Sequence, residues 1–143
     1  MPHPSRRPLD EQAALEALDG LVDAFSRTDT SAYFGQLAPE ATFLFHSEPA
    51  VVPDRTAYRA LWDSWVDSGW RVLACKSSDR QVQLLGSVAV VTHRVRTTLR
   101  TAEGEQQLDE RESVVLARGD DDVLRVVHEH LSPTPPETEE PTA

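Results

Sequence analysis

The chain has a single cysteine, Cys75, among its 143 residues, so no disulfide can form within it. No segment approaches the roughly 18 to 20 consecutive apolar residues that a membrane-spanning helix requires. The first eight residues contain prolines and arginines but lack the apolar stretch of a secretory signal peptide. We therefore expect a cytoplasmic protein that does not associate with membranes.

Basic residues are also scarce, because 14 Lys and Arg stand against 24 Asp and Glu, for a formal charge of -10. This charge repels nucleic-acid phosphates and anionic lipid headgroups, so neither is expected as a partner. A phosphate-binding glycine loop, a Gly-x-Ser-x-Gly motif and a Cys-x-x-Cys motif are all missing. Their absence argues against nucleotide cofactors and serine hydrolysis, and no cofactor is expected.

The length fits one domain, large enough to bury about two thirds of its unfolded surface without a stabilising metal or disulfide. The two ends differ from the rest of the chain. Residues 1–8 are rich in proline, and residues 133–143 combine proline with acidic side chains and no apolar anchor. We predict disordered tails at 1–8 and 133–143, the second acidic and Pro-rich, with one folded domain over 9–132.

Three segments show the spacing of amphipathic helices. The first follows Asp10, a good N-cap, and extends to about residue 27. The second follows Asp29, includes Leu37 and is predicted to end at Pro39, because the residue before a proline resists helical backbone angles. The third follows Asp54, closes near residue 69, and carries the aromatic stripe Tyr58, Trp62 and Trp65.

Most of the remaining sequence predicts strands. A short strand covers 42–46, an extended segment includes Val51 and Val52, and four long strands at 70–85, 88–101, 105–118 and 123–132 form an antiparallel meander. Several strand segments, such as 88–91 and 114–117, are apolar on both faces, whereas a sheet with one solvated face alternates. Because the helices can cover one face, a homodimer paired through the outer face of the sheet is expected to cover the other.

This order of elements resembles the SnoaL-like branch of the nuclear transport factor 2-like superfamily. The strings Leu37-Ala38-Pro39-Glu40-Ala41-Thr42-Phe43 and Val126-Val127-His128-Glu129-His130-Leu131-Ser132 carry the resemblance, together with Arg111 and Ser113. It implies an α+β fold, a cone-shaped half-barrel with three N-terminal helices packed on a curved antiparallel sheet, as in a cystatin-like α+β roll. It also implies an apolar pocket and, usually, a dimer.

The resemblance does not select an activity, because the superfamily includes isomerases, cyclases, dehydratases and proteins that only bind or assemble. The acid/base carboxylate of its cyclases and the tyrosine and aspartate set of its ketosteroid isomerases do not fall on matching positions in this chain. We therefore expect a small-molecule pocket that binds an apolar or polyketide-like ligand, with cofactor-free isomerase, cyclase or dehydratase chemistry through a pocket histidine. The alternative is a non-catalytic dimerisation or ligand-sensing module, so enzymatic activity stays open.

The last strand places two histidines on one face. A period of two groups His128 and His130 with Val126, and Glu129 with Val127 and Leu131 on the opposite face. We assign the histidine face to the pocket, with His128 as a catalytic acid/base and His130 as a substrate contact, although the pattern also allows the opposite assignment.

Other candidates come from the ends and faces of the predicted elements. His46 ends the first strand and is the second catalytic candidate, against a plain loop role. Arg111 is a candidate substrate anchor, against a surface ion pair with its acidic neighbours. Tyr58, Trp62 and Trp65 are candidate substrate contacts, against a purely structural core.

Metal binding is the third possibility for the histidines. His128 and His130 could be joined by His46 or His93 as a third ligand. No carboxylate and glycine pattern follows them, and the chain after Ser132 is predicted to be a tail. We therefore expect no metal, and interpret His93 first as a core residue because it alternates with apolar positions.

Overall fold

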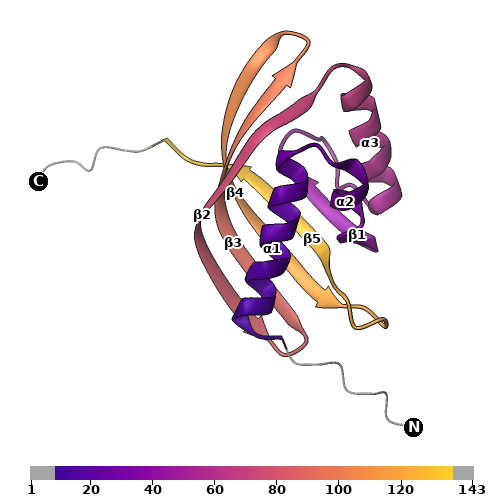
Figure 1. Cartoon of the computed structure of the whole chain (residues 1–143), viewed down its shortest axis with the longest axis vertical. Helices are drawn as coiled ribbons and strands as arrows, with labels where there is room; N and C mark the ends of the chain where they lie inside the picture. The colour runs from indigo at the N-terminus through magenta and orange to yellow at the C-terminus, as the bar shows by residue number, and fades with distance from the viewer. Residues whose placement is uncertain (1–8, 137–143) are drawn as a thin grey trace, which may run out of the picture.

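The computed structural model describes residues 9–136 (Figure 1). Its elements are, in order, α1 (Glu11–Ser26), α2 (Thr30–Phe34), β1 (Leu37–Phe45), α3 (Arg55–Asp67), β2 (Arg71–Leu85), β3 (Val88–Thr101), β4 (Gly104–Arg118) and β5 (Leu124–Pro133). The expected α+β class, with few helices and a curved sheet, is confirmed. The predicted tail over 1–8 and residues 137–143 of the second tail lie outside the described residues.

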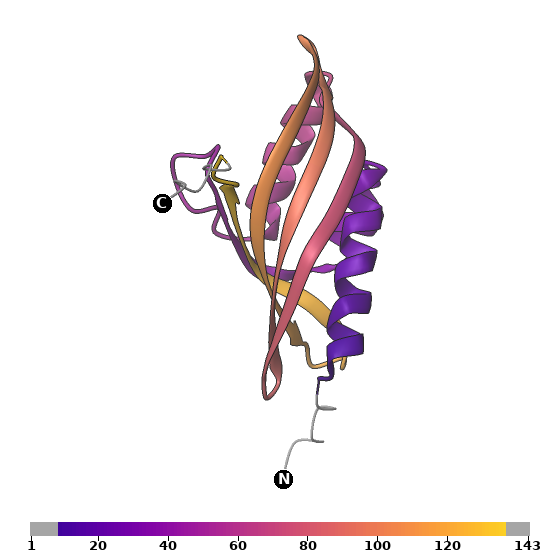
Figure 2. The same cartoon turned by 90° about the vertical axis from the view of Figure 1, so that its left-hand side faces the viewer.

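The five strands form one sheet in the order β1-β5-β4-β3-β2. Strands β2 to β5 make the predicted antiparallel meander, and β1 joins it by pairing in parallel with β5, with Phe43 opposite Glu129. Because β1 and β2 are the two edges, the sheet is open and does not close into a barrel. Figure 2 shows β2, β3 and β4 in front of α3, with α1 along the side, so that the helices lie on one side of the sheet.

Aspartate side chains start all three helices. The carboxylates of Asp10, Asp29 and Asp54 accept hydrogen bonds from the backbone N–H three residues on, at 2.7, 3.2 and 2.8 Å. Each bond satisfies a backbone donor that has no partner within the helix, which fixes where the helix begins. The predicted helix starts are therefore confirmed.

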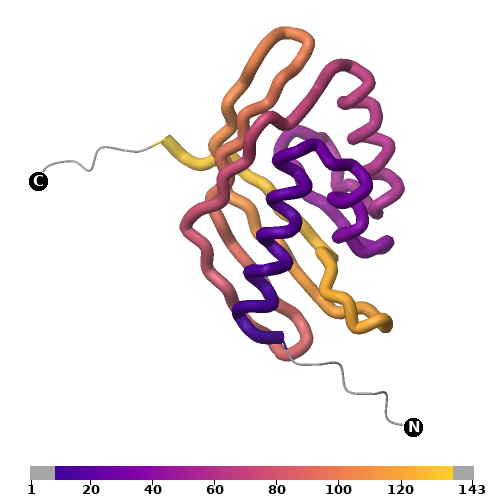
Figure 3. The backbone as a smooth tube through the Cα atoms, in the orientation of Figure 1, coloured from indigo at the N-terminus to yellow at the C-terminus, as the bar shows by residue number. Residues whose placement is uncertain are grey.

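The second helix is shorter than predicted. It ends at Phe34, and Leu37 already belongs to β1, which continues through Pro39. Proline is tolerated there because β1 is an edge strand and its register with β5 shifts between Leu37 and Thr42, so Pro39 need not donate to the ladder. The tube in Figure 3 shows the chain turning from α2 directly into this edge strand.

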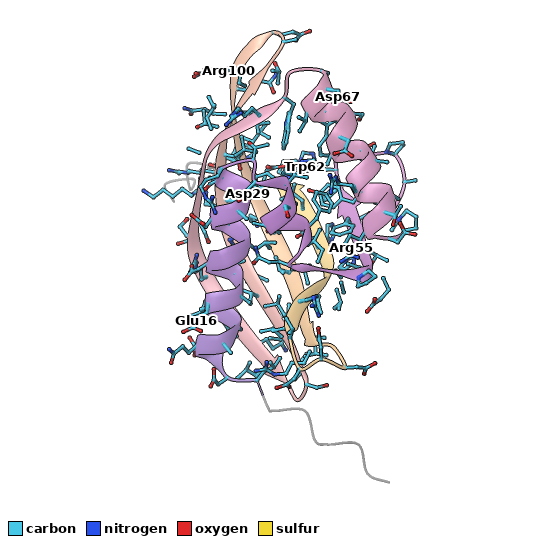
Figure 4. All side chains as sticks on the ribbon, turned by 45° about the vertical axis from the view of Figure 1, so that its right-hand side comes forward. Glu16, Asp29, Arg55, Trp62, Asp67 and Arg100 are labelled. Carbon is cyan, nitrogen blue, oxygen red and sulfur yellow. The ribbon has the colours of Figure 1, made fainter. Side chains whose placement is uncertain are left out.

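The apolar core lies between α1 and the sheet. Buried residues of α1, including Leu18 and Leu21, pack with the inner-face residues Ala89, Val91, Val114, Leu116 and Val126. A second part of the core is aromatic and centres on Trp62, which is fully buried between α3 and the α1–α2 side (Figure 4). Its indole nitrogen donates to Thr30 Oγ1 at 2.9 Å, and its ring stacks on Tyr33 at 5.0 Å.

Among the described residues, no helix is long and apolar enough to cross a membrane.

The burial of Trp62 generates a stability prediction. Trp62→Ala leaves a large cavity and removes the partner of Thr30, so we expect the free energy of unfolding to fall by about 3–5 kcal/mol. Urea unfolding measures it, with Val66→Ala as the control on the exposed side of the same helix, where less than about 1 kcal/mol is expected. Equal losses in the two variants would contradict this description of the core.

Candidate functional site

A cavity of about 460 Å³ opens between the helices and the inner face of the sheet. Helices α1, α2 and α3, the end of β1 and strands β2 to β5 all contribute to its lining. This volume is in the range of pockets that hold drug-sized molecules. The pocket that the family resemblance implied is therefore present in the structure.

The inner face of the sheet changes from apolar to polar along its strands. On β3 the buried series Ala89 and Val91 continues with His93, and on β4 the series Leu116 and Val114 continues with Glu112 and Glu110. The first members of each series belong to the core, and the later members line the cavity. The cavity thus has polar groups on a face whose other positions are apolar.

Strand β5 presents Glu129 to the cavity, and not the two histidines. The pairing of β5 with β4 shifts between Val126 and His128, so Val127 is an extra residue, a β-bulge. The bulge reverses the alternation of faces, and both Val126 and Glu129 are consequently buried on the inner side, at 1% and 2% exposure. The assignment of the histidine face to the pocket is therefore wrong.

The two histidines of β5 lie outside the cavity lining. His128 Nδ1 forms a hydrogen bond of 2.7 Å with Thr42 Oγ1 of the neighbouring strand, and His130 is exposed. Arg111 is likewise exposed and is absent from the lining, because it alternates with Glu110 and Glu112 on β4. Neither His128 nor His130 can touch a ligand in this pocket, nor can Arg111.

His46 is the predicted histidine that does line the cavity. Its Nε2 lies 2.5 Å from Oε2 of Glu110, while its side chain keeps 36% exposure. Burial raises the pKa of Glu110 above its ordinary 4.5, and the hydrogen bond to His46 opposes that shift. The two groups thus form a short hydrogen bond at the edge of the pocket.

His93 is buried, as expected, but it also contributes to the cavity lining. Its Nδ1 lies 2.7 Å from Ser77 Oγ and its Nε2 lies 2.8 Å from Glu112 Oε1. Arg80 donates a hydrogen bond to the same serine oxygen at 2.9 Å and forms a salt bridge with Asp19 of α1. This chain of contacts holds the Glu112 carboxylate in place within the cavity.

Glu129 has the most unusual environment in the cavity. It is almost completely buried, and its Oε1 has no hydrogen-bond partner. Desolvation raises its pKa well above 4.5, and the charge of nearby Glu112 adds to the shift. The neutral carboxylic acid is therefore favoured, in a residue that lines the cavity and has one unpartnered oxygen.

Two phenols lie close to this carboxyl group. The hydroxyl oxygens of Tyr33 and Tyr58 are 3.0 Å apart, and both rings are buried in the lining. Burial raises both pKa values well above 10, with a further contribution from Glu129, so both phenols stay protonated. Only one of the two O–H groups is needed for their mutual bond, which leaves the other to donate elsewhere.

Aromatic rings form the wall on the helical side. Trp65 and Trp70 line the cavity with their ring centroids 5.5 Å apart, and Tyr58 contacts Trp65 edge to face at 6.2 Å. Of the three predicted aromatic contacts, Tyr58 and Trp65 reach the cavity, whereas Trp62 belongs to the core.

Cys75 also lines the cavity, and burial raises the pKa of its thiol to about 11, so the thiol stays protonated at neutral pH. Within residues 9–136, no group of three or more His, Cys, Asp or Glu side chains has an arrangement that could hold a metal ion.

Comparison with known proteins places the fold. The sequence model of the SnoaL-like domain matches residues 14–136, so the chain belongs to the SnoaL-like domain family. No curated protein matches the chain.

Solved structures agree on the fold. A nuclear transport factor 2-like protein from Salmonella enterica has a TM-score of 0.75 at 18% identity, over 92% of this chain and 95% of that one. The CaMKII hub of S. rosetta has a TM-score of 0.68 at 22% identity, over 90% and 100%. A protein with a cystatin-like fold from Nostoc punctiforme has a TM-score of 0.64 at 12% identity, over 89% and 92%. These identities support a shared fold alone.

The buried acid makes stability depend on pH. Because the pKa of Glu129 is higher in the folded than in the unfolded state, its protonation stabilises the fold at low pH, and this contribution is lost as pH rises above 4.5 toward the folded value. Glu129→Gln mimics the neutral acid. In this variant the free energy of unfolding should fall less steeply as pH rises, by up to about 1.4 kcal/mol per pH unit.

Urea unfolding at a series of pH values measures this slope. Glu103→Gln, in the exposed turn between β3 and β4, is the matched control and should leave it unchanged. An identical slope in the wild type and in Glu129→Gln would show that Glu129 is not a buried acid.

Proposed function

We propose that this protein binds an apolar small molecule in the cavity and transfers a proton to or from it without a cofactor. The observation that carries the proposal is the buried Glu129, which lines a cavity large enough for a ligand and whose Oε1 has no hydrogen-bond partner. A fully buried polar atom without a partner costs about 1–3 kcal/mol. A bound ligand that donates to this atom would offset that cost.

The apolar surroundings support binding. Aromatic and aliphatic side chains of α1, α3 and β3 line most of the cavity, among them Phe25, Trp65 and Leu99. Release of water from such walls favours an apolar ligand, while the few polar groups fix its orientation. The wall residues Tyr58 and Trp65 keep their predicted role as substrate contacts.

The proton chemistry is assigned to His46 and Glu110. This pair lies where the cavity meets solvent, since His46 is partly exposed whereas Glu110 is buried. A proton taken from a ligand can therefore pass to the pair and on to water, and the reverse path returns it. Glu129 and the Tyr33–Tyr58 pair hold the ligand from the closed side.

A neutral base-sensitive probe tests this function. Nitrobenzisoxazole is a planar bicyclic compound whose N–O bond breaks when a base removes its ring C–H proton. We expect the protein to accelerate its ring opening, and His46→Ala and Glu110→Gln to lower the rate by at least about ten-fold. The absorbance of the phenolate product measures the reaction.

Two tryptophan substitutions show whether the reaction occurs in the cavity. Leu108→Trp fills the cavity from β4 and should abolish the reaction, whereas Gln107→Trp, next in sequence but on the opposite face, should not. Equal rates in these two variants, or an unchanged rate in His46→Ala, would contradict the proposal.

The outer face of the sheet is assigned to a homodimer. Val90 and Val115 are cross-strand neighbours on this face. Both side chains stay partly exposed, because no helix covers this side of the sheet. The similarity in fold to a CaMKII hub supports this assignment. A second copy paired sheet to sheet would bury these apolar side chains.

The dimer generates its own prediction. Val115→Glu places a charge among apolar side chains of the outer face, so it should convert the dimer into a monomer in native mass spectrometry. Gln107→Glu, at an exposed position of the same face, is the control and should remain dimeric. A wild-type monomer at micromolar concentration would overturn this assignment.

A further inference from the structure

The charges of the sheet are segregated between its two faces. Three glutamates line the cavity from neighbouring strands: Glu110 and Glu112 on β4 and Glu129 on β5. The arginines of β3 and β4, such as Arg96 and Arg111, alternate with the inner residues and therefore face outward. No Lys or Arg is among the cavity-lining residues of the described chain.

This arrangement leaves the acidic groups without a permanent cation. His46 and His93 contact Glu110 and Glu112, respectively, and these are the basic side chains in the described lining. Glu129 has neither an ion pair nor a hydrogen bond at Oε1, and it is buried beyond the reach of bulk water. The polar group that the cavity still requires is therefore a donor, and a positively charged donor would suit the three carboxyl groups best.

The aromatic wall favours the same kind of ligand. The rings of Phe25, Trp65 and Trp70 line one side of the cavity. The ring centroid of Trp70 lies 6.2 Å from that of Phe25 and 5.5 Å from that of Trp65. The faces of aromatic rings attract cations, tryptophan most strongly, and the attraction grows when water is excluded. An anionic ligand would meet repulsion from the glutamates and find no arginine or lysine to bind.

We propose that the ligand of this cavity is an apolar organic amine, bound as the ammonium ion with its N–H donating to the carboxylate of Glu129 and its carbon skeleton against Phe25, Trp65 and Trp70. This inference rests on the proposed function, because it names the ligand class of the same pocket. No covalent bond changes on binding. Glu129 loses its proton to water as the ammonium ion enters, and the two opposite charges then neutralise each other within the cavity.

Three probes of one skeleton test the charge preference: naphthylethylamine, naphthylethanol and naphthylacetic acid. Isothermal titration calorimetry should give an affinity for the amine at least about ten-fold above that for the alcohol, and little or no binding of the acid. Titrations of the amine in two buffers of different ionisation heat should also show proton release. This second readout uses the wild-type protein and so does not depend on a variant that folds.

Glu129→Gln separates the carboxylate from the shape of the pocket. It should bring the affinity for the amine down to that for the alcohol and abolish proton release. Glu103→Gln, with the same charge change on the surface, should retain the preference for the amine.

The possible failures can be told apart. If the alcohol binds as tightly as the amine, or the acid binds too, the charge inference is wrong, while loss of alcohol binding in Leu108→Trp would still support an apolar pocket. If none of the three probes binds, both the ligand class and the pocket function are overturned.

Discussion

Removing the carboxyl group of Glu129 from water is the constraint on which the rest of the site depends. An ionised carboxylate without a partner is too costly in such a place, so the fold either keeps this acid neutral or supplies a cation. The surrounding side chains supply none, since Tyr33 and Tyr58 are phenols and Glu112 is itself acidic. Because no protein side chain supplies a cation to Glu129, we interpret the cavity as a ligand site and not as a defect in packing.

The rest of the architecture serves to hold that group in place. The β-bulge at Val127 turns Glu129 inward, β1 pairs in parallel with β5 directly at this residue, and α3 closes the cavity with aromatic rings. The helical core around Trp62 and the capped helix starts fix α3 relative to the sheet. Stability is thus provided by one part of the inner face, and function is assigned to the other.

Much of the fold could be predicted from the sequence because its signals are local. Aspartate caps, helical spacing and turn residues identified three helices and a meander. The end of α2 and the start of β1 were misplaced, because Pro39 lies in an edge strand. The site was harder to predict. A strict period of two grouped His128 and His130 with buried Val126, and a single inserted residue reversed that grouping. Nothing in the string itself marks Val127 as a bulge.

A signal for the missed carboxylates was nevertheless present. Glu110 and Glu112 continue the same alternating face as Val114 and Leu116, so their inward orientation follows from the period of two that located β4. They were interpreted as neighbours of exposed Arg111 instead. The sequence did identify three lining residues correctly: His46 at the end of a strand, and Tyr58 and Trp65 on a helical stripe. At these positions the local pattern and the tertiary position agree.

The most direct test of this account is an NMR titration of the carboxyl carbon of Glu129, assigned by its loss in Glu129→Gln. We predict that this carbon titrates well above 4.5 in the ligand-free protein. A midpoint at or below 4.5 would mean that the group is hydrated or paired, and would contradict both the buried acid and the ligand site built on it.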